Sequence, residues 1–152
     1  MGERIAIASD HAAVDMKAAL IAHLGERGHE VVDLGPDGFD SVDYPDYGYK
    51  LAEVVASGDA DRGIALCGSG IGISIAVNRH PGCRCALVSE PLSARLAREH
   101  NDANVLALGA RLIGLEMAKT CIDVFLAAPY GAGRHQRRVE KLSHPRIAKE
   151  FA

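Results

Sequence analysis

Short apolar runs alternate along the chain with longer segments in which apolar residues recur every three or four positions. The short runs lie at 5–8, 30–34, 64–67, 84–88 and 104–108, and such continuous hydrophobicity predicts strands buried on both faces of a parallel sheet. The longer segments predict helices over 12–27, 44–57, 90–99 and 114–126, with a further helix that ends near 78. This alternation with short links predicts an α/β fold, a doubly wound parallel sheet of about five strands with helices on both faces.

Several predicted helices carry residues suited to their ends. Gly28 follows the first helix, where glycine reaches the left-handed conformation of a C-terminal cap at little cost. Pro45 and Pro91 lie in the first turns of two other helices, where a missing N–H does no harm. No repeat or linker interrupts 1–152, so we expect one domain.

The pattern breaks at Pro129, and a basic helical segment begins at Arg134. This C-terminal helical extension, about 130–152, has too little apolar surface for a core of its own. We therefore expect it to pack across a neighbouring surface, for which a partner subunit is the natural candidate.

Composition narrows the function classes. A chain of 152 residues with 48% apolar and 24% charged residues is typical of a soluble globular protein, and a net charge of −3 gives no reason to expect a nucleic-acid or membrane partner. The start does not resemble a signal peptide, so we expect a cytoplasmic protein with reduced cysteines. Cys-x-Cys without a second ligand pair is a poor zinc signature, and we predict Cys83, Cys85 and Cys121 as core residues.

The segment from Ile64 to Ala76 combines a buried strand that ends on Cys67, a glycine-rich loop and an apolar helix. Glycines allow positive φ and a close approach of the backbone to a bound group, and N–H groups at a helix start favour an anion. The same dipoles stabilise a thiolate, so Cys67 is a candidate base or nucleophile. The alternative, a turn in which a buried cysteine packs as a small hydrophobe, stays open. The loop residues are Gly68, Ser69, Gly70, Ile71 and Gly72.

Other polar residues follow the carboxyl ends of predicted strands, where ligands bind in such sheets. Asp10 and His11 follow the first strand, and Arg111 follows the fifth. Asp10 could instead cap the first helix, since aspartate is a favoured N-cap residue, and His11 could be an ordinary surface histidine.

A second group of candidates lies outside those strand ends. His100 and Asn101 end a predicted helix, so the chain must fold back before they join the other residues. Arg134 and Arg138 are four residues apart on one helical face, and paired guanidinium groups suit a phosphate. A helix-end histidine and a solvated basic face are the alternatives.

Several phosphate-handling classes are excluded. A cysteine-phosphatase loop needs arginine six residues after its cysteine, where Ile73 stands, and a P-loop needs a lysine that is absent here. A receiver domain would have aspartate in place of Cys67 and lysine in place of Arg111. No His and carboxylate cluster has catalytic metal spacing, which leaves metal-free acid–base chemistry on a small phosphorylated molecule.

Taken together, the motifs resemble those of the type B ribose-5-phosphate isomerases, a family that also includes galactose-6-phosphate and allose-6-phosphate isomerases. The resemblance runs in the family's order over nearly the whole chain. It is carried by Ser9-Asp10-His11, Asp43-Tyr44-Pro45, the segment from Cys67 to Ser74, Ser89-Glu90-Pro91, the segment from His100 to Leu106, and the segment from Gly133 to Glu140.

The resemblance implies a Rossmann-like fold and a homodimer or tetramer whose active site is shared between subunits and uses no metal or cofactor. It implies that Cys67 moves a proton between C1 and C2 of ribose 5-phosphate through an enediolate, with Ser69 close to that proton. His100, aided by Asp10, would open the furanose ring. Ile73 stands where a subgroup has a glutamate base, so this chain resembles the cysteine subgroup.

The resemblance also implies the substrate-binding groups. Asn101 and the backbone from Gly68 to Gly72 would form an anion hole. His11 would bind the phosphate with Arg134 and Arg138 of the partner subunit, and Arg111 would belong to the binding set. Another sugar phosphate as substrate, such as a hexose or tetrose phosphate, or a non-catalytic sensor, are the alternatives.

Overall fold

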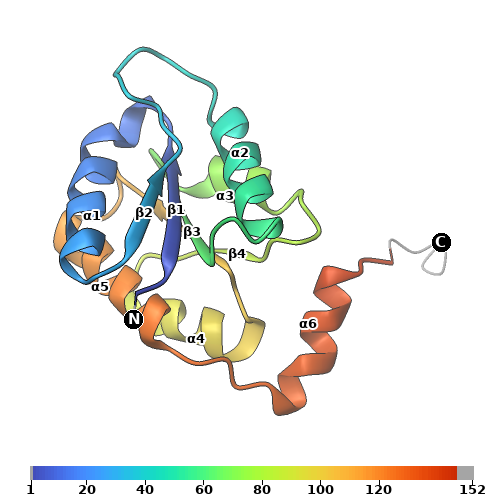
Figure 1. The fold of residues 1–152 in the computed structure, drawn as a ribbon. Helices are drawn as coiled ribbons and strands as arrows, with labels where there is room; N and C mark the ends of the chain where they lie inside the picture. Colours follow the sequence, from blue (N-terminus) through green and yellow to red (C-terminus); the bar gives the residue numbers. More distant parts are fainter. Residues whose placement is uncertain (1, 147–152) are drawn as a thin grey trace.

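Five parallel strands form one sheet in the order β2-β1-β3-β5-β4 (Figure 1). This is the arrangement in a computed structural model that describes residues 2–146. All four neighbouring pairs are parallel, which confirms the predicted sheet. The order changes direction between β1 and β3, so the switch point lies at their carboxyl ends. The strands are β1 (Arg4–Ser9), β2 (Glu30–Asp33), β3 (Arg62–Cys67), β4 (Cys85–Leu87) and β5 (Val105–Gly109).

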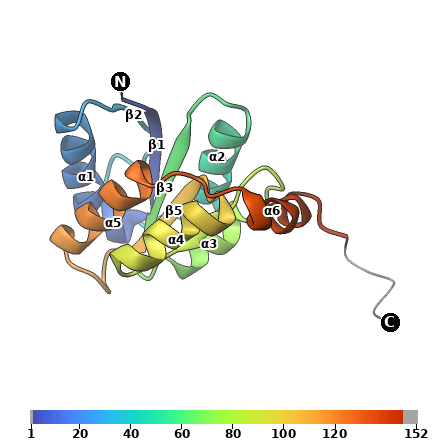
Figure 2. The ribbon, with the colours of Figure 1, turned by 90° about the horizontal axis from the view of Figure 1, so that it is seen from below.

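Helices cover both faces of the sheet, and Figure 2 shows α1 and α5 on one side of the strands and α2 on the other. Alternate residues of β1 serve the two cores, with Ile5 and Ile7 in one and Ala6 and Ala8 in the other. The first core lies under α1, α4 and α5, and the second under α2 and α3. The helices are α1 (Val14–Glu26), α2 (Tyr44–Ala56), α3 (Ile71–Val77), α4 (Pro91–Asn101) and α5 (Leu115–Ala127).

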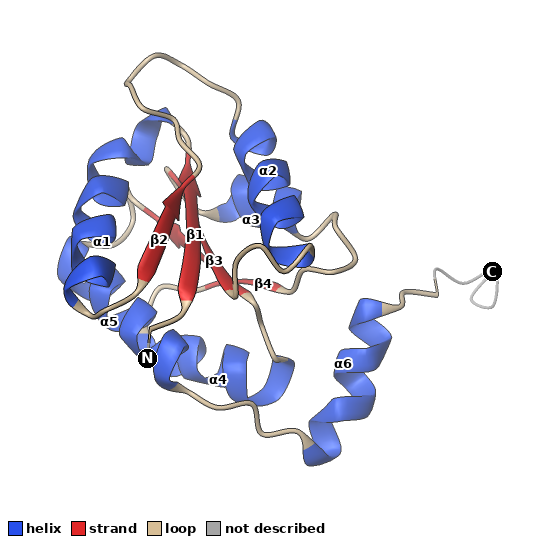
Figure 3. Cartoon of the chain, viewed as in Figure 1, coloured by secondary structure: helices blue, strands red, loops and turns tan. Residues whose placement is uncertain are grey.

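The residues that the sequence placed at helix ends lie there in the structure. A 3-10 turn, η1 (His11–Ala13), precedes α1, and Gly28 beyond its end has φ +85°. Pro45 and Pro91 occupy first turns as predicted. The loop from β2 to α2 arches beyond the carboxyl ends of the strands (Figure 3).

The C-terminal extension leaves the body of the fold through η2 (Gly133–His135) and α6 (Gln136–Ser143), which stands apart in Figure 1. Val139 is the buried residue of α6, and Arg84 Nη1 donates to Ser143 Oγ at 3.1 Å. A helix is therefore present as expected, although it begins at Gln136. Residues 147–152 lie outside the described residues, and contact with a partner subunit stays a prediction.

Three of the four cysteines are buried, all four are free, and Cys85 is only half-buried. The prediction of Cys85 as a core residue was therefore too strong, because β4 is an edge strand of the sheet. In residues 2–146, no helix is long and apolar enough to cross a lipid bilayer.

Candidate active site

The loop between β3 and α3 surrounds the thiol of Cys67, which is 4% exposed. The N–H of Gly70 donates to Cys67 Sγ at 3.1 Å, and the N–H of Ile71 donates to Ser69 Oγ at 3.2 Å. An N–H group aimed at sulfur stabilises a negative charge there. The loop therefore aims an N–H group at Cys67, and the same side chain also packs in the second core with Ala65 and Ile73, as the alternative allowed.

The close packing of this loop accounts for two of its glycines. Gly70 has φ +75°, and a Cβ on it would lie 2.6 Å from Leu87 Cδ1 and 2.8 Å from the carbonyl carbon of Leu108. A Cβ on Gly72 would lie 2.5 Å from Cζ of the Tyr44 ring. The loop backbone thus passes directly over the end of β5 and under an aromatic ring.

Asp10 and His11 lie at the end of β1, beside this loop. The Asp10 N–H donates to the Leu66 carbonyl at 3.1 Å, which ties the end of β1 to β3. Asp10 Oδ1 accepts from the Ala12 N–H at 2.9 Å, so the capping role expected as an alternative is present. His11 Nδ1 accepts from the Val42 N–H at 3.1 Å, and a neutral ring then carries its proton on Nε2.

Arg111 completes the group at this edge of the sheet. Its N–H donates to the Gly68 carbonyl at 2.9 Å, and its Cδ and Nη1 would lie 3.4 Å from a Cβ on Gly68. The exposed guanidinium therefore lies over the Cys67 loop. Strand ends that are distant in sequence bring Asp10, His11, Cys67 and Arg111 to one edge, as predicted.

His100 and Asn101 lie at the opposite edge of the sheet. Their helix, α4, runs back from the carboxyl end of β4 to the amino ends of the strands. Just after it, the Asn104 N–H donates to the Arg84 carbonyl at 3.0 Å, and the Gly63 N–H donates to the Asn104 carbonyl at 2.9 Å. Figure 1 shows α4 below the sheet, beside the N-terminus. The expected fold-back is thus wrong for a single chain: Cys67 and His100 do not meet within it.

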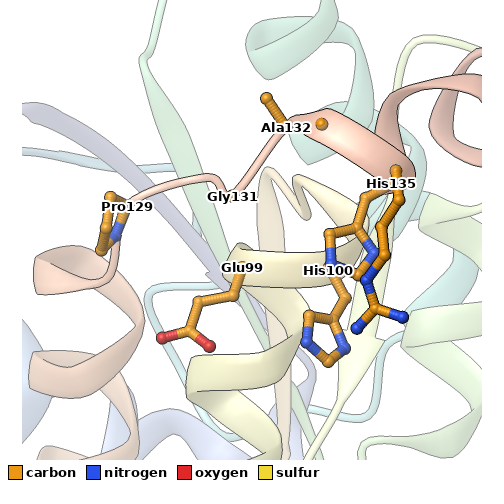
Figure 4. Close-up of a pocket in the computed structure, with 8 residues that line it drawn as sticks. Glu99, His100, Pro129, Gly131, Ala132 and His135 are labelled. Atoms are coloured by element: carbon orange, nitrogen blue, oxygen red, sulfur yellow. The ribbon is translucent and has the colours of Figure 1, made fainter.

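A pocket of about 390 Å³ surrounds His100 at this second edge (Figure 4). It is formed by the end of α4 and by the segment that leads into α6, and Arg134 contributes to its lining. The His100 ring is stacked on that of His135, with centroids 4.3 Å apart. Sequence reasoning did not select His135, although it stands between the two arginines of the basic motif. Arg134 and Arg138 are exposed.

The remaining three cysteines lie away from the loop between β3 and α3. Burial raises the pKa of Cys83 to about 11, and burial also raises the pKa values of Cys85 and Cys121. These three thiols stay protonated at neutral pH. Over residues 2–146, no group of three or more His, Cys, Asp or Glu side chains is placed to hold a metal ion.

Comparison with known proteins identifies the family. The family model described as "Ribose/Galactose Isomerase" matches residues 5–142. Ribose-5-phosphate isomerase B of Escherichia coli is 49% identical over 141 residues, which are 93% of this chain and 95% of that protein.

Solved structures agree. A Thermotoga maritima ribose 5-phosphate isomerase is 50% identical with a TM-score of 0.92, and the match covers 94% of this chain and 99% of that one. The Trypanosoma brucei type B enzyme is 43% identical with a TM-score of 0.91, covering 94% and 98%. The chain therefore belongs to the ribose/galactose isomerase family of aldose–ketose isomerases.

Proposed function

We propose that this protein interconverts ribose 5-phosphate and ribulose 5-phosphate through an enediolate, in active sites that two subunits build together. The single observation that carries the proposal is the Cys67 thiol at the switch point, held by the Gly70 N–H at 3.1 Å. The names of the closely similar Escherichia coli and Thermotoga maritima proteins support the choice of sugar.

In this reaction Cys67 acts as the base. Its thiolate removes the proton from C2 of the open-chain aldose, the C1–C2 double bond forms, and the carbonyl electrons move to oxygen O1. The O2 proton then passes to O1 as the C2 carbonyl forms, and Cys67 returns the carbon-bound proton to C1, which gives the ketose. Loop N–H groups and Asn101 stabilise the enediolate charge, a contribution of about 3 kcal/mol for each well-aimed donor.

Ring opening requires a second group, and His100 suits it as the acid that protonates the furanose ring oxygen. Asp10 is 7% exposed, and within the described residues its Oδ2 has no hydrogen-bond partner, which leaves this oxygen free to take the proton of the sugar's anomeric hydroxyl. His11, Arg111, Arg134 and Arg138 supply positive or donor groups for the phosphate, whose binding positions the distant reacting carbons.

The two edges of the fold support a shared site. One edge carries Cys67 and the other carries His100, so a complete set of groups forms when the Cys67 edge of one chain meets the His100 edge of another. Apolar side chains beside the Cys67 loop are unusually exposed, Ile71 by 51% and Leu87 by 42%. A partner that covers them would bury apolar surface and close the site together.

Turnover of the purified protein on ribose 5-phosphate, beside allose 6-phosphate and erythrose 4-phosphate and with EDTA present, tests the proposed reaction. Faster turnover of the pentose is expected. Turnover of only allose 6-phosphate or erythrose 4-phosphate would keep the reaction and change the assigned substrate. Tight binding of a sugar phosphate without turnover of any of the three would favour a sensor.

Mixing two inactive variants tests the shared site. Cys67→Ala and His100→Asn damage opposite edges, so a heterodimer of the two variants has one intact site out of two. Random exchange makes half of the dimers heterodimeric, and about a quarter of the wild-type activity returns. Cys67→Ala mixed with Arg111→Ala is the matched control, because both changes lie on one edge and no intact site can form. Exchange without recovery in the first mixture would refute the shared site.

A further inference from the structure

His135 stands face to face with His100 in the second-edge pocket. Their ring centroids are 4.3 Å apart and their planes are inclined by 19°, and Figure 4 shows both rings beside the last turn of α4. Within residues 2–146 neither imidazole makes a side-chain hydrogen bond to the protein. The stack therefore restrains the plane of the His100 ring where no hydrogen bond does.

The backbone from Gly131 to His135, just before α6, holds the His135 ring against His100. The Gly131 N–H donates to the Glu99 carbonyl at 2.9 Å, and a Cβ on Gly131 would lie 2.9 Å from that oxygen. Ala132 then adopts φ +45° and ψ −129°, a region that L-residues rarely occupy. The His135 N–H donates to the Ala132 carbonyl at 2.9 Å and closes the turn. The segment is thus docked on the end of α4, and a strained residue persists beside the stack.

Charge around the stack leaves His135 neutral. Desolvation lowers the pKa of His135, and the positive charges of His100, Arg134 and Arg138 lower it further. On the α4 side the other charged group of the pocket is Glu99, which faces Arg95 with Nε and Oε1 3.7 Å apart. A neutral ring adds no second positive charge next to the imidazole that has to deliver a proton.

We propose that His135 is a positioning residue for the ring-opening acid: it holds the His100 ring plane by stacking, so that the proton of His100 meets the ring oxygen of the closed sugar. This inference rests on the proposed function, in which His100 opens the furanose ring. Placement within a fraction of an ångström decides the rate of such a proton transfer.

Three variants test the proposal on ribose 5-phosphate. His135→Ala removes the stack, and we expect kcat to fall about tenfold with little change in KM. His135→Phe keeps an aromatic face without a titratable group and is expected to stay within about threefold of wild type. His144→Ala, an exposed histidine at the end of the same helix, is the control for loss of a histidine from the extension.

A second readout separates positioning from general damage. Ribulose 5-phosphate has no ring to open, so exchange of its C1 hydrogen with deuterium from solvent needs Cys67 but not His100. We expect His135→Ala to exchange at the wild-type rate. The ring-current shift of the His100 protons in NMR spectra should vanish in His135→Ala and persist in His135→Phe.

The outcomes are distinct. Wild-type protein without ribose 5-phosphate turnover would overturn the proposed function. An active wild type with full kcat in His135→Ala would overturn only the role of His135. Equal losses of turnover and exchange in His135→Ala, or equal losses in the alanine and phenylalanine variants, would also overturn it.

Discussion

Replacing Gly70 with alanine tests whether the Cys67 loop depends on the backbone of this residue. Gly70 is buried, and its φ of +75° lies in the left-handed region. Its N–H is also the donor to Cys67 Sγ. The substitution adds a single methyl group to this position and changes no charge.

The structure sets the expected magnitude. A left-handed conformation costs a non-glycine residue about 1–2 kcal/mol. The new Cβ would also lie 2.8 Å from the carbonyl carbon of Leu108 and 3.0 Å from its oxygen. Because these are backbone atoms of a central strand, they cannot rotate away, and forced overpacking adds about 1–3 kcal/mol. We expect the free energy of unfolding to fall by roughly 2–5 kcal/mol, a large part of the stability of a typical domain.

Urea unfolding followed by circular dichroism, at one fixed protein concentration, measures this change. Gly25→Ala is the matched control, because Gly25 lies in α1 with nothing within 4 Å of the added Cβ. This variant should have a free energy of unfolding about 0.5–1 kcal/mol higher than that of the wild type. A Gly70→Ala protein that unfolds within about 0.5 kcal/mol of wild type would refute the reasoning.

Three further predictions concern other parts of the chain. Lys17 is buried and its Nζ lies 2.6 Å from Asp33 Oδ1. Asp33→Ala should lower the free energy of unfolding by about 3–5 kcal/mol, because it leaves a buried ammonium group without its carboxylate partner. Lys17→Met removes the charge as well and should lower the same free energy by about 1–2 kcal/mol. Equal losses of the two variants in urea unfolding would contradict this. Ala132 has a φ of +45°, which glycine adopts without strain, so Ala132→Gly should raise the free energy of unfolding by about 0.5–1 kcal/mol. An unchanged free energy of unfolding would contradict this. The lowered pKa of His135 means that the folded protein binds fewer protons than the unfolded chain just below pH 6.5, so this residue lowers stability as the pH falls through that value. The fall in melting temperature from pH 7.5 to 5.5 should be smaller in His135→Phe, and an unchanged fall would contradict the assignment.

The sheet and the Cys67 edge could be predicted because their signals are local. Strands buried on both faces are apolar at every position, as in the run from Ile64 to Leu66, and parallel order brings Asp10, Cys67 and Arg111 to one edge wherever the strands pair. The role of Gly70 in approaching Leu108 needed the structure, since a glycine pattern does not identify the atoms that it approaches.

The second edge was harder to predict. His100 was expected to fold back toward Cys67, but every helix in a parallel α/β unit returns to the amino edge, and the end of α4 follows that rule. His135 has no spacing that relates it to His100, because the stack arises from an unusual turn at Ala132. Cys85 looked like a core residue because an edge strand and a central strand have the same short apolar pattern.

The position of His100 changes the meaning of the exposed apolar side chains near Cys67. In a single chain, Ile71 and Ile75 lie one helical turn apart with about half of each side chain in contact with solvent, which would be an unfavourable surface for a monomer. Meanwhile His100, the proposed ring-opening acid, lies in a pocket at one edge of the sheet, and Cys67, the proposed base, lies at the other edge. The proposed symmetric pair of chains would cover the apolar side chains and complete the site together, since a contact that brings His100 to Cys67 in one site would repeat itself in the other. In that proposed pair the basic extension would be part of the active site of a neighbouring chain, which would explain why it buries only Val139 of α6.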